Sequence, residues 1–306
     1  MKSGQKMLTS SPEAMNSWSA FGYLPRTRQS RVRGLVAWLV ATTLAFGKPL
    51  SDLLVRAAES ELLSYIPLVP FVAGYLLWTR RNSLHAEHRS SIIGSVILAG
   101  VAAAAIIARI FLGTGLSLND NQALMSLAYV CVMVAGGFLF LGSQWMASAA
   151  FPVAFLFFLI PIPDAAVHFL QTASVLASAD VAEWLFKMTG TPLVRDEQVL
   201  MLPGIVLQVA QECSGIHSSW VLFITSIVAS NLFLENPWRR VALVLFVIPL
   251  AIVRNAFRIL VIGLLCVHVG PHMIDSIIHR RGGPFFFVLS LGPLFLFLVW
   301  LKRQER

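Results

Sequence analysis

Three polar interruptions in the apolar C-terminal third carry residue types that could do chemistry together. The first is the run QECSGIH at 211–217, which introduces a long apolar segment. The second is RNAFR at 254–258, inside the next apolar segment, and the third is HRRGG at 279–283, before the last one. Their cysteine could supply a nucleophile, their arginines could stabilise an anion, and their histidine could carry a proton. Apolar segments alone would only place the chain in a bilayer, so these polar residues indicate a reaction there.

Cys213 is the one cysteine of three with polar neighbours and a place at a predicted helix start. A helix N-terminus favours the thiolate, which is the nucleophilic form of cysteine. An isolated Cys-Ser-Gly stretch also fits a buried cysteine beside small residues. Cys131 and Cys266 lie inside apolar runs and are expected to be small buried hydrophobic residues.

Arg254 and Arg258 are four residues apart, so they lie on one face of the predicted helix 238–265. An arginine deep in a membrane helix costs about 2.5–3.5 kcal/mol on the insertion scale, so it usually faces a polar cavity or a partner. Arg258 is nearer the outer end, where its donors suit a developing oxyanion, although a structural ion pair would also explain it. Arg254 lies a turn deeper and is expected to be structural. Asn255 either orients Arg258 or bonds a neighbouring helix.

His279 precedes the last apolar segment and could meet Cys213, because cysteine and histidine pair in space rather than in sequence. His268 and His272 compete for the same role, and spacing alone does not choose among the three. Asp275 could orient any of them.

Several other polar residues are weaker candidates. Glu212 could tune the thiol or bind substrate. His217 lies one turn after Cys213 on the same helix face and could act on the thiol without touching the substrate. The run 195–197 is expected to be a polar turn, and Arg109 is expected to extend from its helix towards the membrane surface. No spacing of metal ligands is convincing, and no cofactor is expected.

Composition predicts a polytopic membrane protein. The 306 residues are 57% hydrophobic and only 12% charged, with a mean hydropathy of +0.75, whereas soluble domains carry about 25% charged residues. The net charge of +8 comes from arginines at the ends of apolar runs. No extended basic face interleaved with aromatics is present, so nucleic acid is excluded as a partner and membrane lipids are expected instead.

The apolar runs predict an all-α bundle of about eight transmembrane helices in one domain, 34–306, after an irregular cytoplasmic tail, 1–33. Arginine clusters fall on one side of the membrane if both termini are cytoplasmic. The predicted spans are 34–55, 62–79, 91–112, 122–142, 145–162, 213–233, 238–265 and 284–301.

Two segments between the fifth and sixth spans are expected outside the bilayer core. Residues 166–189 hold too many polar groups for a lipid-facing span, and their apolar residues recur at helical spacing, which predicts an amphipathic helix on the outer membrane surface. Residues 191–209 predict short extended pieces that lead to Cys213. The glycines and prolines between 265 and 283, together with Pro284, predict a structured loop.

The ordered motifs between 151 and 290 resemble the exosortase/archaeosortase family of membrane-embedded cysteine transpeptidases. The matching stretches are FFLIPIP at 157–163, GTPLVR at 190–195, LP at 202–203, ECSGI at 212–216, NAFRI at 255–259, and His279 four residues before Gly283.

The resemblance implies a cysteine protease/transpeptidase with Cys213 as nucleophile, Arg258 as essential arginine and His279 as third member. Implied substrates are membrane-anchored proteins whose C-terminal sorting signal, of PEP-CTERM type, comprises a short motif, a transmembrane helix and a basic tail. The implied location is the cytoplasmic (inner) membrane, with the site facing outward.

Two other functions also fit a chain with intramembrane arginines. One is a transporter of anions or lipids, although the halves of the chain lack the repeat symmetry common in transporters. The other is a non-catalytic subunit of a polysaccharide export system. Only the enzyme requires Cys213.

Overall fold

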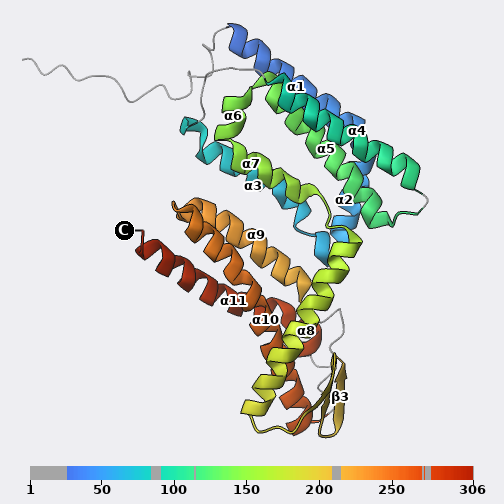
Figure 1. Ribbon diagram of the computed structural model, residues 1–306, viewed down its shortest axis with the longest axis vertical. Coiled ribbons are helices and arrows are strands. Elements are labelled where there is room, and N and C mark those ends of the chain that lie inside the picture. Colours follow the sequence, from blue (N-terminus) through green and yellow to red (C-terminus); the bar gives the residue numbers. More distant parts are fainter. Residues whose placement is uncertain are drawn as a thin grey trace, which may run out of the picture.

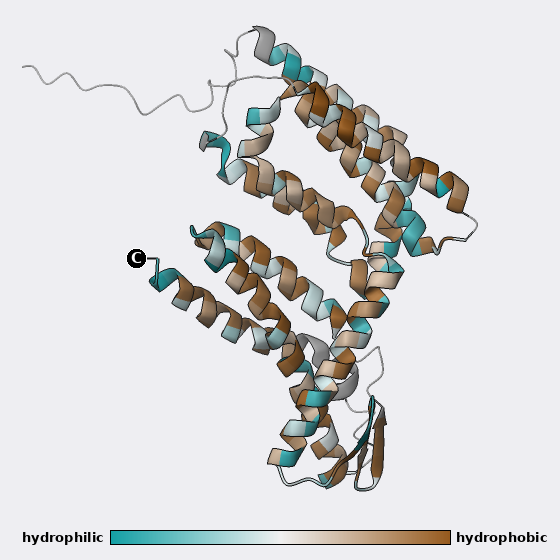
Figure 2. Cartoon of the chain, in the orientation of Figure 1, coloured by the Kyte–Doolittle hydropathy of each residue, from teal (hydrophilic) through white to brown (hydrophobic). Residues whose placement is uncertain are grey.

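Helices make up most of this protein, and their lengths fit a membrane bundle. The computed structural model describes residues 26–83, 91–113, 115–208, 215–270, 272 and 277–305, with the backbone alone at 26–28, 83, 208 and 277–284. Within these residues, six helical segments are long and apolar enough to cross a bilayer, and two bent helix pairs raise the number to eight if each crosses. The predicted all-α polytopic bundle is confirmed. Figure 2 shows its apolar residues along the helices and many of its polar residues at helix ends.

The first predicted span, 34–55, is not one straight helix. α1 (Arg26–Ala45) is followed by α2 (Gly47–Glu59), and the two are bent by 69° at Phe46. Pro49 explains the bend, because it has no N–H to donate to the carbonyl four residues earlier. Helix α1 also begins before residue 34, where the predicted span began.

The N-terminal bundle is built around α5 (Leu118–Phe140), which contacts α1, α2 and α4 (Ile92–Leu112). Two short 3₁₀ turns, η2 (Glu61–Leu63) and η3 (Ile66–Leu68), lead into α3 (Val69–Thr79). Cys131 is buried inside this bundle, as predicted. Helix α4 packs mainly on α5 and leaves its other side exposed, as expected for a surface that faces acyl chains.

The fifth predicted span, 145–162, is wrong as one continuous helix. The chain forms α6 (Ser143–Ser148), α7 (Ala150–Phe155) and η5 (Leu156–Leu159), then turns by 92° into α8 (Asp164–Met188). Pro161 and Pro163 lie in the turn and prevent the helical hydrogen bonds that would carry the chain straight on.

The predicted helix at 166–189 is confirmed as α8. Its buried stripe, formed by Val175, Ala179, Ala182 and Phe186, lies on the side where it packs against α10 (Pro237–His268). Phe186 approaches so closely that a Cβ on Gly263 of α10 would come within 2.4 Å of its ring. The location of this helix on the membrane surface stays a prediction.

Residues 191–209 contain the predicted extended pieces. Strands β1 (Val194–Asp196), β2 (Val199–Leu202) and β3 (Ile205–Gln208) form an antiparallel sheet in the order β1-β2-β3. The buried side chains Leu200, Leu202 and Leu207 pack with α8 and α10, so the sheet is fixed to both helices. Figure 1 shows it beside the lower parts of these helices.

Helix α10 belongs to two different cores. Its N-terminal half packs with α9 (Ile216–Phe233) and α11 (Ile277–Arg303), through residues such as Leu243 and Val247. Its C-terminal half packs with α8 and the sheet, through Ala256, Ile259 and Leu260. Arg254 therefore lies between the residues of the two cores, and Arg258 lies among those of the second. The course of α10 past α9, α11 and α8 can be followed in Figure 1.

The end of the chain fastens the α9–α10 turn. The carboxylate of Glu305 accepts hydrogen bonds from the backbone N–H groups of Glu235 (3.0 Å) and Asn236 (2.9 Å). Arg239 lies 3.8 Å from the same carboxylate. The two backbone N–H groups, followed by the nearby arginines, lower the pKa of Glu305.

Candidate functional site

Gly215 is the first described residue after the predicted nucleophile and caps the N-terminus of α9. Its backbone is left-handed, with φ 63° and ψ 17°. Its carbonyl oxygen accepts hydrogen bonds from the backbone N–H of Ser219 (2.9 Å) and from the hydroxyls of Ser218 (3.0 Å) and Ser219 (2.9 Å). Cys213 and Glu212 lie outside the described residues. Gly215 is therefore the described residue from which the position of the candidate site is argued.

Arg254 adds a fourth donor to the same carbonyl. Its Nη2 lies 3.2 Å from the Gly215 oxygen and 2.9 Å from the Ser219 hydroxyl. Only 8% of the Arg254 surface is exposed. The guanidinium therefore ties α10 to the first turn of α9, which agrees with the expected structural role but places it beside the nucleophile segment.

The left-handed backbone favours glycine at position 215, and the space around it is tight. A side chain in the left-handed region costs about 1–2 kcal/mol. A Cβ here would also lie 3.1 Å from Arg254 Nη2 and 3.5 Å from Asn255 Oδ1. The glycine of the ECSGI motif thus allows the arginine of α10 to reach the helix start.

Two donors at this junction remain unused within the described part of the chain. Arg254 Nη1 and Asn255 Nδ2 are both buried, and neither has a hydrogen-bond partner there. Arg258, one turn further along α10, is half-buried, and its charge is near enough to repel that of Arg254. An anionic group placed between the two guanidinium groups would relieve this repulsion.

The other side of the α9 start faces η2 and η3. Residues of η2, which begins at Glu61, contact α9. Trp220 packs edge-on against Tyr65 (6.3 Å between centroids) and Phe158 (6.0 Å). Sequence reasoning missed the contacts of η2 and Tyr65 with α9, because they join segments more than 140 positions apart in the sequence. The aromatic side chains give the site a rigid apolar wall.

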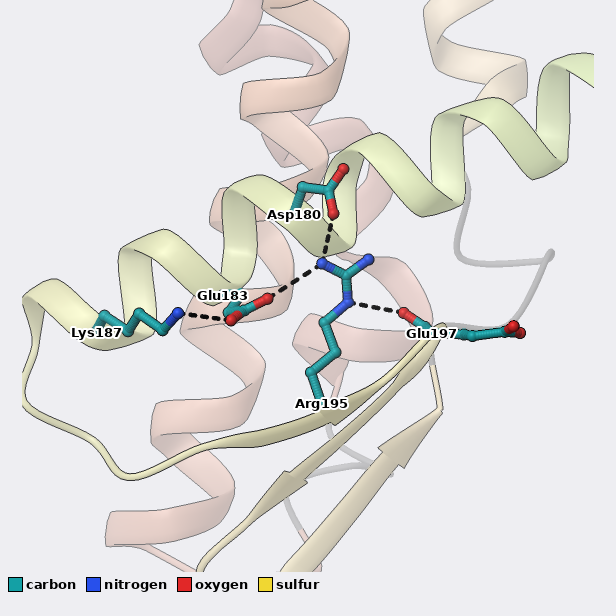
Figure 3. A network of polar contacts seen from close by, with 5 residues as sticks. All are labelled: Asp180, Glu183, Lys187, Arg195 and Glu197. Atoms are coloured by element: carbon teal, nitrogen blue, oxygen red, sulfur yellow. Dashed lines mark hydrogen bonds and ion pairs between the residues drawn. The ribbon is translucent and has the colours of Figure 1, made fainter.

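The sheet that leads to residues 209–214 is fastened to α8 by Arg195 (Figure 3). Its Nη1 donates to Asp180 Oδ1 and, at 3.1 Å, to Glu183 Oε2, while its Nε donates to the carbonyl of Glu197. Burial opposes ionisation of the guanidinium, but the two carboxylates outweigh it and raise the pKa of Arg195. The prediction of a polar turn at 195–197 is wrong at Arg195 and Asp196, which lie in β1, whereas Glu197 lies in the turn that follows.

The family model for transmembrane exosortase (Exosortase_EpsH) matches residues 56–296. The chain belongs to the transmembrane exosortase family. No curated protein and no solved structure matches the chain. The family match includes η2, α8, the sheet and the residues that surround the start of α9.

In this exosortase-family chain, His279 lies in the first turn of α11 and not in a loop. Gly282, Gly283 and Pro284, predicted to be loop residues, belong to the same helix. Membrane helices tolerate glycine and proline better than soluble helices do, so these residues are weaker stop signals here. Only the backbone of His279 is described.

The competing candidates around the α10–α11 connection are not brought together with Gly215. His268 is the last residue of α10 and is exposed, and His272 is exposed as well. Asp275 lies outside the described residues. Among the residues that the structure describes, no group of three His, Cys, Asp or Glu side chains could hold a metal ion.

The structure describes the surroundings of Arg109 and Cys266, two other residues considered in the sequence. Arg109 is exposed and bonds Asn121 of α5, so it does more than extend towards the surface. Cys266 is buried, as predicted.

Proposed function

We propose that this chain is a membrane-embedded cysteine protease/transpeptidase that cleaves the C-terminal sorting signal of exported proteins. The thiolate of Cys213 attacks the scissile carbonyl carbon, and the guanidinium of Arg258 stabilises the oxyanion. His279 protonates the leaving amine, and the carbon–nitrogen bond breaks to give a thioester. Water or an acceptor amine or glycan then attacks the thioester and releases the thiol.

One observation carries this proposal: Arg254 of α10 bonds the carbonyl of Gly215 at the start of α9. Gly215 follows Cys213 by two positions in the chain, and two residue steps span at most about 7 Å. Arg258 lies one helical turn from Arg254, about 6 Å along the axis. This supports a site in which the nucleophile and the arginine pair are neighbours.

The substrate is a protein whose own C-terminal helix enters the bilayer beside the bundle, with its short motif at the outer face of the cytoplasmic membrane. The aromatic wall around Trp220 and the exposed helix faces suit such an apolar partner. Arg254 Nη1 and Asn255 Nδ2 have no hydrogen-bond partner among the described residues, so they are donors for carbonyl groups of the motif. Glu212 and His217 are positioned in the sequence to adjust the thiol, and Asp275 to orient His279.

The test is coexpression with a tagged protein that ends in a short motif, one apolar helix and a few arginines. Cleavage is expected to disappear with Cys213→Ala, Arg258→Ala and His279→Ala. Matched controls are Cys131→Ala and Cys266→Ala, which remove buried thiols elsewhere. Normal processing by correctly inserted Cys213→Ala protein would refute the mechanism, whereas a thioester adduct on Cys213 in mass spectra supports it.

A further inference from the structure

A cavity lined by both charged and apolar residues opens where α2, α4 and α5 meet, in the bundle that does not contain Arg254. Its volume is about 340 Å³, and its charged lining residues are Lys48, Asp52, Arg56 and Arg109. Lys48 Nζ is 3.8 Å from Asp52 Oδ2, and these side chains are 88% and 55% exposed, so the pair is weak. Three cations share one carboxylate, which leaves the cavity with an excess of positive charge.

Neither arginine of the cavity forms an ion pair within the described part of the chain. Arg109 donates from Nε to Asn121 Oδ1 and from Nη1 to Met125 Sδ, both at 2.7 Å, and both partners are neutral. The guanidinium of Arg56 has no hydrogen bond or ion pair with any residue that the structure describes. An anion that enters the cavity can therefore meet Arg56 without breaking an existing contact.

A hydrogen bond between two lining residues joins α2 and α5 at the cavity. Gln122 of α5 is 9% exposed, and its Nε2 donates to the carbonyl of Pro49 at 2.6 Å. This bond holds the first turn of α2 against α5. Helix α2 also buries Leu53 and Ala57 on the side away from its charged residues. The amphipathic helix thus presents Lys48 and Arg56 from a set position.

Large exposed apolar side chains lie at the cavity and on the helices that form it. Leu118, which lines the cavity, is 80% exposed. On the same helices, Val55 of α2 is 58% exposed, and Ile110 and Phe111 of α4 are 73% and 81% exposed. In a chain that spans a bilayer, such side chains face acyl chains rather than water. A ligand that matches both features carries a negative headgroup and a hydrocarbon tail.

We propose that this cavity binds the phosphate of an anionic phospholipid, with the acyl chains lying on the exposed faces of α2 and α4. Arginine forks match phosphate oxygens, and basic pockets between membrane helices bind anionic headgroups. A free phosphate ion offers the same charge but nothing for the exposed apolar side chains. The inference uses no residue of the proposed catalytic site and stands whether or not Cys213 reacts.

Binding is tested by native mass spectrometry of the full chain in detergent, titrated with phosphatidylglycerol or phosphatidylcholine. The pocket variant is Arg56→Gln with Arg109→Gln. The control is Lys187→Gln with Arg303→Gln, which removes the same charge away from the cavity. Arg56→Gln alone is a second variant. The Arg56 side chain forms no hydrogen bond or ion pair with a described residue, so this substitution is not expected to destabilise the fold.

Phosphatidylglycerol is expected to bind more tightly than phosphatidylcholine, and its apparent Kd is expected to rise about tenfold or more in the double pocket variant but not in the control. Arg56→Gln alone is expected to give a smaller rise. Equal binding by wild type and both pocket variants overturns the proposal. Full displacement of phosphatidylglycerol by millimolar inorganic phosphate overturns the lipid assignment, because the tail would then contribute nothing.

Discussion

Replacing Arg254 with methionine is expected to change the reactivity of Cys213 but hardly the stability of the protein. The substitution removes a stabilising hydrogen bond, but it also removes the cost of burying an arginine, and the two free energies are of similar size. A hydrogen bond from a charged donor contributes about 1.5–3 kcal/mol. The bond to the Ser219 hydroxyl, at 2.9 Å, is a full one, whereas the Gly215 oxygen keeps three other donors when Arg254 is removed. Methionine relieves the cost of an arginine among apolar residues, about 2.5–3.5 kcal/mol on the insertion scale.

The free energy of unfolding of Arg254→Met is therefore expected to differ from that of wild type by about 1 kcal/mol or less. Thermal and denaturant unfolding in lipid nanodiscs measures it. A decrease of about 3 kcal/mol or more in the free energy of unfolding would show that Arg254 chiefly stabilises the fold. It would refute the expectation that the two effects cancel.

Reactivity is expected to respond differently. In a background without Cys131 and Cys266, a soluble alkylating reagent reports on Cys213 alone. Loss of the positive charge beside the nucleophile segment is expected to slow alkylation at neutral pH by about tenfold, which corresponds to about 1.4 kcal/mol. Arg254→Lys keeps the charge and is expected to retain most of the rate. Equal rates in wild type and Arg254→Met contradict the proposed placement.

Three further outcomes are expected. Gly215→Ala destabilises the chain by about 1–2 kcal/mol in unfolding assays, whereas Gly100→Ala, where a Cβ meets nothing within 4 Å, is neutral or stabilising; equal effects would contradict the left-handed cap. Arg195→Gln speeds hydrogen exchange in the sheet, because three contacts to α8 and the turn are lost, whereas Lys187→Gln, which breaks one exposed pair, has little effect. Glu305 has a folded-state pKa below its unfolded value, so its carboxylate stabilises the α9–α10 turn above the unfolded pKa, near 4.3, and this stabilisation is lost as the pH falls through the folded pKa. Hydrogen exchange in that turn should then differ between wild type and Glu305→Gln at pH 7 and converge in acid, and a difference that persists in acid would exclude the carboxylate as the cause.

The membrane spans that could be predicted are those in which an uninterrupted apolar run has the length of one membrane crossing. Helix α4 was expected at 91–112 and runs over Ile92–Leu112, because nothing inside it breaks the backbone pattern. The strands before Cys213 could also be predicted, since Pro203 and Gly204 separate two alternating runs. Gly204, with φ 82°, occupies the turn between β2 and β3.

The bends could not be placed from hydrophobicity alone, because each bent helix pair is apolar enough overall to count as one span despite the polar residues that follow Phe46 and Leu159. In both cases a proline decides the direction of the chain, whereas Pro284 lies within α11. The difference lies in whether neighbouring helices and local backbone adjustments satisfy the freed carbonyl groups, and the local sequence does not contain that information.

The candidate site was predicted in part. Spacing put Arg254 and Arg258 on one helix face, and the motif placed Gly215 near the cysteine. The contact between Arg254 and the Gly215 carbonyl depends on how α9 and α10 cross, so only the three-dimensional structure reveals it. The roles of Cys213, Arg258 and His279 stay predictions.

The length of α10 bears on where water can enter. Its 32 residues extend about 48 Å, whereas the hydrocarbon layer is about 30 Å thick. A helix that begins at one surface therefore either tilts strongly or emerges on the far side by several turns. Emergence would place Arg258 near the level where acyl chains give way to headgroups. A thioester at that depth could be hydrolysed by solvent that never crosses the membrane interior.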